Sequence, residues 1–275
     1  MTLLRALGRC AVALALAAAG SRPAAAQSIE PLAERTLLTL DARDERAVWA
    51  NPAGLARSVQ ASVAGDLTVA REAGDVRLAQ FGAALSSRGL AFGWEHDRSA
   101  GGPTTDTYVL GLGLGDEVFS GGASHRWRAH GQGSWDVGLR GRVRPWLDLS
   151  LVWREIGSPL VQGVVLRDRF VPGAGIRLFG DRLLAGAEGV VPGDLGNLTE
   201  AHAGATVAIL PRVTVSYRAT FSRDPARRGA VVVVGIGARA WRGAAASVFS
   251  QADGLTALGA DAAVVGDLAG GRSHR

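Results

Sequence analysis

Two runs of alternating apolar and polar residues, joined by a proline, limit what this chain can fold into more than any other feature. Residues 135–144 and 147–154 each place large apolar side chains on one parity and charged or small ones on the other. Successive side chains of a β-strand point to opposite faces, so each run predicts a strand with one apolar and one polar face. Pro145 lies between the runs and predicts the turn of a hairpin. The apolar positions are Trp135, Val137, Leu139, Val143, Leu147, Leu149, Leu151 and Trp153.

The N-terminus has the three parts of a secretory signal. Two arginines lie in the first nine residues, an apolar run follows over residues 10–19, and the small residues 24–26 precede Gln27. This order predicts export, with cleavage after Ala26. The single cysteine, Cys10, leaves with the signal, so we expect an exported chain that is stabilised without disulfides.

The charge of the chain gives little support to nucleic-acid binding. Arg5, Arg9 and Arg22 leave with the signal while no acid does, so the net charge of +5 falls to +2. The remaining arginines are scattered singly among acids, without a basic stripe or interleaved stacking aromatics. We therefore expect no nucleic-acid partner.

Alternation recurs along the rest of the chain and predicts an all-β protein. After the signal no segment has the roughly 20 apolar residues that a membrane-spanning helix needs. Alternating segments, separated by glycine, proline and aspartate turn signals, instead predict about 14 strands of roughly 9–11 residues, the length of a tilted membrane-spanning strand. The segments are 62–70, 76–85, 90–95, 107–114, 118–128, 135–144, 147–154, 173–179, 183–191, 201–210, 212–221, 230–240, 244–249 and 257–265.

Two observations favour a membrane barrel over a soluble β-sandwich. The outer positions of a sandwich face water and are richly charged, whereas the polar parity here is mostly small residues with occasional arginine, as in a barrel lumen. Aromatic residues lie near segment ends, where membrane barrels carry aromatic girdles. We predict an antiparallel transmembrane β-barrel surrounded by the outer-membrane lipid of a Gram-negative-type bacterium; a soluble periplasmic β-protein is the alternative. The aromatic residues are Trp94, Trp127, Trp135, Trp146, Trp153, Phe179, Phe221 and Trp241.

The segment before the first strand differs in kind. Residues 28–50 tolerate a helix, and Asn51 followed by Pro52 is a good cap and first residue of a short helical turn. On spacing alone this pattern fits a corner between a helix and a strand.

The stretch from Asn51 to Leu55, preceded by the acidic, alanine-bearing run 41–49 and followed by β-segments, resembles the long-chain fatty acid outer-membrane transporter (FadL-like) superfamily and is similar to its PorV/PorQ branch. The resemblance implies a 14-stranded barrel plugged by an N-terminal hatch. It places the hatch motif inside the lumen, at Asn51, Pro52, Ala53 and Gly54.

The signal pattern, the strand pattern and the resemblance together divide the chain into a signal peptide (1–26), a hatch (27–57), a barrel (58–268) and a polar tail (269–275). Two features depart from the family. The longest expected connections, 157–169 and 192–198, are shorter than the outer loops that build the hydrophobic binding groove of the fatty acid transporters. The last six residues also lack the terminal aromatic residue of many barrels.

Patterns of catalysis and metal binding are weak. Residues 231–240 imitate a dinucleotide-binding turn, but another turn follows where a helix is required, so we expect a strand with glycines facing the lumen. The histidines lack metal-ligand spacing, and no nucleophile elbow is present. We expect a non-enzymatic protein without metal or cofactor, and interpret Glu95 and Glu188 as solvated pore lining.

Alternation also assigns charged side chains to the lumen. We hypothesise that they pair across the lumen and with a hatch that carries Asp41, Asp44 and Glu45, which would hold the plug; the alternative is a path for polar solutes. The lumen-lining candidates are Asp136, Arg140, Arg142, Asp148, Arg154, Arg177, Glu188, Arg218 and Arg239.

Two functions fit these predictions. The first is passive transport of a small hydrophobic solute through a barrel that opens when the hatch moves. The second is a structural or assembly role, as in the PorV/PorQ branch, with a secretion-system protein as partner. Short loops favour the second slightly, whereas the hatch motif is common to both.

Overall fold

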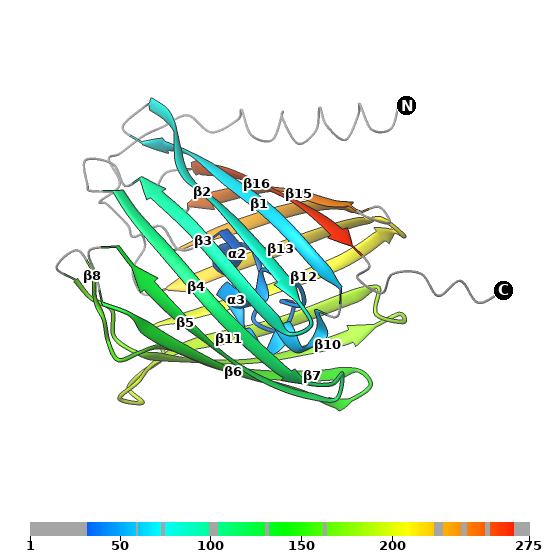
Figure 1. The fold of residues 1–275 in the computed structure, drawn as a ribbon. Coiled ribbons are helices and arrows are strands. Elements are labelled where there is room, and N and C mark those ends of the chain that lie inside the picture. The colour runs from blue at the N-terminus through cyan, green and yellow to red at the C-terminus, as the bar shows by residue number, and fades with distance from the viewer. Residues whose placement is uncertain are drawn as a thin grey trace.

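The alternating segments form the strands of one closed antiparallel sheet (Figure 1). The computed structural model describes residues 32–58, 60–72, 75–98, 104–129, 132–161, 164–222, 228–237, 241–250 and 254–266, so the predicted signal peptide and polar tail lie outside the described residues. Fourteen strands pair side by side, and the first pairs with the last, which confirms the predicted barrel of about 14 strands. The strands are β1 (Ala61–Glu72), β2 (Asp75–Ser87), β3 (Leu90–Arg98), β4 (Thr104–Gly115), β5 (Phe119–Arg128), β6 (Ser134–Arg144), β7 (Leu147–Ile156), β10 (Arg169–Leu178), β11 (Leu183–Pro192), β12 (Glu200–Leu210), β13 (Val213–Ser222), β14 (Gly229–Gly237), β15 (Trp241–Ser250) and β16 (Gly254–Gly266).

The hairpin around Pro145 consists of β6 and β7. Pro145 and Trp146 form its turn, as the sequence predicts, and Leu139 pairs with Leu151 across it. These two leucines are exposed on the outside of the barrel, while the side chain of Asp148 on the other face is buried. The apolar face of the hairpin therefore points out of the barrel and the charged face points into it.

The predicted connection over 157–169 contains a second, small sheet. In it β8 (Leu160–Val161) pairs with β9 (Val164–Val165), and β10 begins at Arg169, earlier than the predicted strand. Val171 of β10 packs against buried valines of the neighbouring strands, and this apolar contact favours an extended backbone there.

The two ends of the barrel differ in their connections. At one end, which we call the turn end, the chain enters β1 and leaves β16, and the hairpins close through tight turns. Arg88 and Gly89 both have positive φ, 49° and 86°, as a type I′ hairpin turn requires. The opposite end, which we call the loop end, carries the longer connections 157–168 and 193–199.

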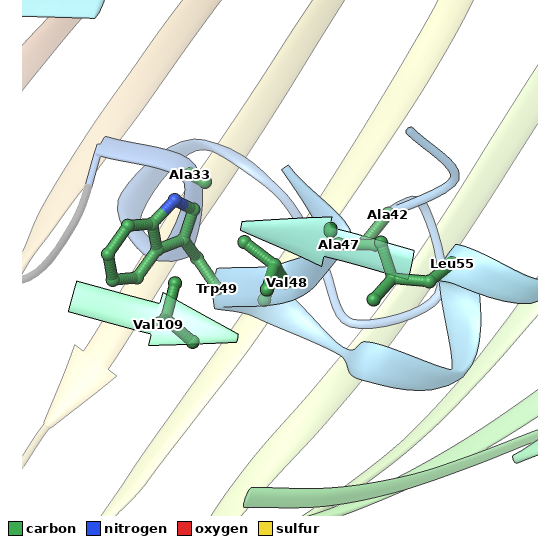
Figure 2. Close-up of a cluster of buried hydrophobic side chains, with 9 residues drawn as sticks. Ala33, Ala42, Ala47, Val48, Trp49, Leu55 and Val109 are labelled. Atoms are coloured by element: carbon green, nitrogen blue, oxygen red, sulfur yellow. The ribbon is translucent and has the colours of Figure 1, made fainter. Parts of the chain in front are cut away.

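The segment predicted to be a hatch lies inside the barrel (Figure 1), and we keep the name hatch for it. Its described part forms α2 (Leu32–Thr36), α3 (Ala47–Ala50) and the 3₁₀ helix η1 (Pro52–Arg57). Val48, Trp49 and Leu55 pack with Val109 of β4 and form the main apolar cluster, which Figure 2 shows between the hatch and the wall. Among the described residues no helix is long and apolar enough to cross a membrane.

Candidate functional site

Asn51 organises the hatch motif. Its Oδ1 accepts a hydrogen bond from the backbone N–H of Ala53 (3.1 Å), so the predicted cap at the start of η1 is confirmed. Its Nδ2 donates to the backbone carbonyl of Thr39 (3.1 Å), which ties the motif to the preceding hatch segment. Asn51 is completely buried, so both ends of its amide are satisfied without water.

Glycines on the wall let the motif approach closely. A Cβ on Gly138 of β6 would overlap the Oδ1 of Asn51, and one on Gly122 of β5 would overlap the carbonyl of Pro52. Gly54 of the motif is constrained in the same way, because a Cβ there would overlap the carbonyl of Ala42. The motif therefore approaches β5 and β6 closely because the wall lacks side chains at these two positions, and Gly54 permits close packing within the hatch.

Glu34 joins α2 of the hatch to three arginines of the wall. Its carboxylate accepts from Arg154 on β7, lies 2.6 Å from Nη2 of Arg126 on β5, and lies 3.9 Å from Nη2 of Arg169 on β10. Burial alone raises the pKa of this carboxyl group, but the three positive charges outweigh burial and lower the pKa of Glu34 from 4.5 to about 2. Glu34 is therefore a buried, ionised anchor.

Two of these arginines also bind the end of α3. Arg126 donates to the carbonyl of Trp49 (2.9 Å) and Arg154 to the carbonyl of Ala50 (2.5 Å). The last carbonyls of a helix have no partner within it, so cations at that end are favourable. Asp136, 2.7 Å from Nη2 of Arg126, supplies a further counter-charge from β6.

Further round the same side of the barrel, Glu188 on β11, the strand next to β10, also holds the hatch. Its carboxylate accepts from the backbone N–H of Thr39 (2.8 Å) and from Arg218 on β13 (3.3 Å), and lies 2.9 Å from Nδ1 of His202 on β12. Arg218 also donates to the backbone carbonyl of Glu34. Polar contacts to the hatch thus follow a continuous arc of strands from β5 to β13.

A second charged layer lies nearer the turn end, around the buried carboxylate of Asp148. Arg177 (2.5 Å), Arg142 (3.2 Å) and Arg140 (3.3 Å) all donate to it. Arg140 also donates to the backbone carbonyl of Ala42 in the hatch (3.3 Å). This layer therefore combines pairing within the wall with a contact to the hatch.

Arg242 on β15 binds two acids of the hatch, Asp44 and Glu45. Burial raises the pKa of the Asp44 carboxyl, but Arg46 and Arg242 outweigh it, and the pKa of Asp44 lies well below its ordinary value. Glu45 is fully buried and also accepts a hydrogen bond from the hydroxyl of Ser62 on β1 (2.7 Å).

The lumen-lining candidates predicted from sequence belong either to the contacts around Glu34 and Glu188 or to the layer around Asp148. Arg239 is the exception, because it lies outside the described residues. Asp41 accepts from the hydroxyl of Thr206 (2.9 Å), and no arginine of the described residues donates to it. The interpretation of Glu95 and Glu188 as solvated pore lining is wrong, because they are 3% and 5% exposed. Glu95 accepts from Nε2 of Gln80 (2.5 Å).

Sequence reasoning missed Glu34, Arg126 and Arg242. Arg126 lies on the inward parity of a predicted strand, and this parity alone would have identified it as a lumen-lining candidate. For Glu34 no spacing rule distinguishes it from the other acids before residue 50. Among the described residues no group of His, Cys, Asp and Glu has the arrangement of a metal site.

An open hollow of about 940 Å³ lies at the loop end, over β12, β13 and β14. Tyr217 and Phe221 line it from the outer face, Leu198 from the preceding connection, and Thr220 from the inward face. Since side chains of both faces take part, the hollow lies at the rim of the barrel. Its remaining lining residues are mostly small or apolar, among them Ala201, Ala219 and Ala230.

No protein-family model and no curated protein matches the sequence. Among solved structures, the Acinetobacter baumannii outer membrane protein Omp33 aligns with 75% of this chain and 98% of its own, with a TM-score of 0.53 and 11% identity. A substituted Rh. blastica porin aligns with 76% of this chain and 99% of its own, with a TM-score of 0.46 and 10% identity. At this identity the likeness to Omp33 shows a shared barrel fold.

Proposed function

We propose that this protein is a non-enzymatic outer-membrane barrel that its own hatch keeps closed, and that it passes a small hydrophobic solute passively when the hatch moves. The observation that carries the proposal is the attachment of the hatch by buried polar contacts to neighbouring strands of the wall, centred on Glu34 and Glu188. These contacts are non-covalent, so the attachment is reversible.

The outer wall supports a membrane setting over a soluble one. Leu110 and Leu112 of β4 are 50% and 43% exposed, and similar side chains cover much of the outer surface. Contiguous apolar surface on this scale marks a membrane or protein contact. Bacterial outer-membrane barrels place short turns on the periplasmic side, so the turn end, where β1 begins and β16 ends, faces the periplasm in this proposal.

Two observations support a hydrophobic solute. The motif from Asn51 to Gly54 resembles that of the FadL-like superfamily, whose members take up long-chain fatty acids. The hollow at the loop end, with Leu198, Tyr217 and Phe221 in its lining, offers apolar surface where a solute from outside would arrive.

Planar bilayer recordings of the purified protein test the closed state. We expect a nearly silent membrane, because the described hatch occupies the lumen; a steady large-pore current contradicts the plug. Uptake of a labelled long-chain fatty acid by a deletion strain tests transport, and unchanged uptake argues against it. The mature protein is expected to begin at Gln27, which N-terminal sequencing will check.

A second candidate function is an assembly role at the cell surface. Leu160, Val165 and Leu195, at the loop end, are 45%, 54% and 74% exposed, which suits contact with another protein. If this function holds, the deletion strain loses surface or secreted proteins while its fatty acid uptake stays unchanged. Loss of uptake with intact secretion favours transport.

A further inference from the structure

Four arginines gather where the hatch meets the wall at the turn end. Arg43 and Arg57 belong to the hatch, and Arg140 and Arg142 to β6. Arg57 donates to the backbone carbonyl of Glu117 (3.0 Å), and Arg142 lies 4.0 Å from the carboxylate of the same residue. Arg140 donates to Ala42, the neighbour of Arg43.

Negative charge in this cluster is scarce. Asp148 is the buried carboxylate, and it is already shared by Arg140, Arg142 and Arg177. Glu117 is 81% exposed at its side chain, so water screens its charge. Burial lowers the pKa of Arg57, and the charges of Arg43 and Arg142 lower it further, which shows that like charges face one another here.

One donor of this cluster is unused, and so is one donor of Arg177, which shares Asp148 with the cluster. Among the residues that the structure describes, the Nε of Arg43 and the Nη2 of Arg177 are buried without a hydrogen-bond partner. The side chain of Arg177 is 3% exposed, so solvent does not satisfy this donor from the surface. A buried donor without a partner costs about 1–3 kcal/mol, more for a charged group.

We propose that the arginine cluster at the turn end is a binding site for a phosphate-type oxyanion, which bridges Arg43 and Arg57 of the hatch to Arg140 and Arg142 of β6. Guanidinium groups match the oxygens of phosphate, and each bond to an ionised partner is stronger than a neutral one. Donors that arrive from both the hatch and the wall suit a tetrahedral anion with several oxygens better than a carboxylate with two.

The bound anion has a consequence for the hatch. Because it contacts both surfaces, it stabilises the seated hatch and is released when the hatch leaves the wall. The site is independent of which solute, if any, passes through the lumen. The phosphate group comes either from a free phosphate or from a phospholipid headgroup of the periplasmic leaflet.

Thermal unfolding of the purified protein in uncharged detergent tests the site, with tryptophan fluorescence as the readout. Inorganic phosphate is titrated against chloride at equal ionic strength. In a second arm, the micelles carry phosphatidylglycerol or a diacylglycerol with the same chains. A saturable rise of the midpoint with phosphate identifies a free anion; a rise with phosphatidylglycerol alone identifies a headgroup.

Arg43→Gln is the diagnostic variant, because it removes the Nε that is buried without a hydrogen-bond partner among the described residues. We expect it to weaken binding about ten-fold or more. Arg142→Gln is the second variant, since Asp148 keeps its other two arginines. Arg212→Gln, an exposed arginine in a turn at the same end, is the control for charge and should bind as the wild type does.

The proposal is overturned if neither phosphate nor phosphatidylglycerol shifts the midpoint beyond its matched control. It is also overturned if Arg43→Gln and Arg142→Gln respond as the wild type does. Neither result bears on whether the barrel transports a solute, because no flux is measured.

Discussion

The carboxylate of Glu34 in the hatch lies 2.6 Å from Nη2 of Arg126 on the barrel wall, and both side chains are almost completely buried. A buried ion pair contributes little net stability compared with an apolar contact, but removing one partner leaves an uncompensated charge. This relationship makes Glu34 the position where the attachment of the hatch is most easily weakened without altering the barrel.

Glu34→Gln keeps the size of the side chain and removes its charge. Removing one partner of a buried pair costs about 3–5 kcal/mol, and we expect about 3 kcal/mol because Asp136 still pairs with Arg126. The hatch should leave the wall more often, seen as frequent openings in planar bilayers and faster tryptic cleavage at Arg43 and Arg46.

Asp75→Asn is the matched control, since Asp75 is an exposed acid at the loop end. It should behave as the wild type does in both measurements. Wild-type silence and protease resistance in Glu34→Gln would contradict the role of this anchor.

The attachment should also respond to acid. The pKa of Glu34 is lowered from 4.5 to about 2, so its ionised form stabilises the folded state. This contribution is fully present above about pH 4.5 and is lost as the pH falls through about 2. We expect recordings to stay silent from pH 7 to pH 4.5 and to show openings that increase below that range. In Glu34→Gln the openings should already be present at pH 7, and an equal acid response of both proteins would assign it to another group.

Gly138→Ala tests the fit between hatch and wall. Its Cβ would overlap Oδ1 of Asn51 and press on Pro52, and overpacking of this kind costs about 1–3 kcal/mol. We expect the barrel to keep its heat-modifiable gel mobility while tryptic cleavage of the hatch accelerates. Gly121→Ala is the control, because its Cβ meets Leu139 at an ordinary contact distance of 3.4 Å. Equal protection of the hatch in both variants would show that the close approach at Gly138 is not required.

The strands and their faces were predictable because a period of two is local. Parity alone predicts that Trp135, Leu139 and Leu151 face outward, and all three are exposed in the structure. The start of β10 was not predictable, because it depends on valines of neighbouring strands.

The partners of the hatch were beyond the reach of sequence spacing. Glu34 and Arg154 are 120 residues apart, and nothing local specifies which acid meets which arginine. The glycines of the wall, in contrast, do indicate in the sequence where the hatch lies. Gly111, Gly122 and Gly138 share the inward parity of adjacent strands and mark where the hatch approaches the wall.

Leu110→Arg and Leu114→Arg test whether the outer wall faces a bilayer. Both side chains point outward from β4, at 50% and 67% exposure, but Leu110 lies in the middle of the strand and Leu114 near the turn end. An arginine facing lipid costs about 2–4 kcal/mol at the midplane of a bilayer and about 0–1 kcal/mol near its interface. We therefore expect Leu110→Arg to lower the free energy of unfolding from phosphatidylcholine vesicles strongly and Leu114→Arg to lower it little, as measured by urea titration with gel mobility as the readout. Water around the barrel would make the cost of the two substitutions equally small, which is the result that the soluble alternative requires.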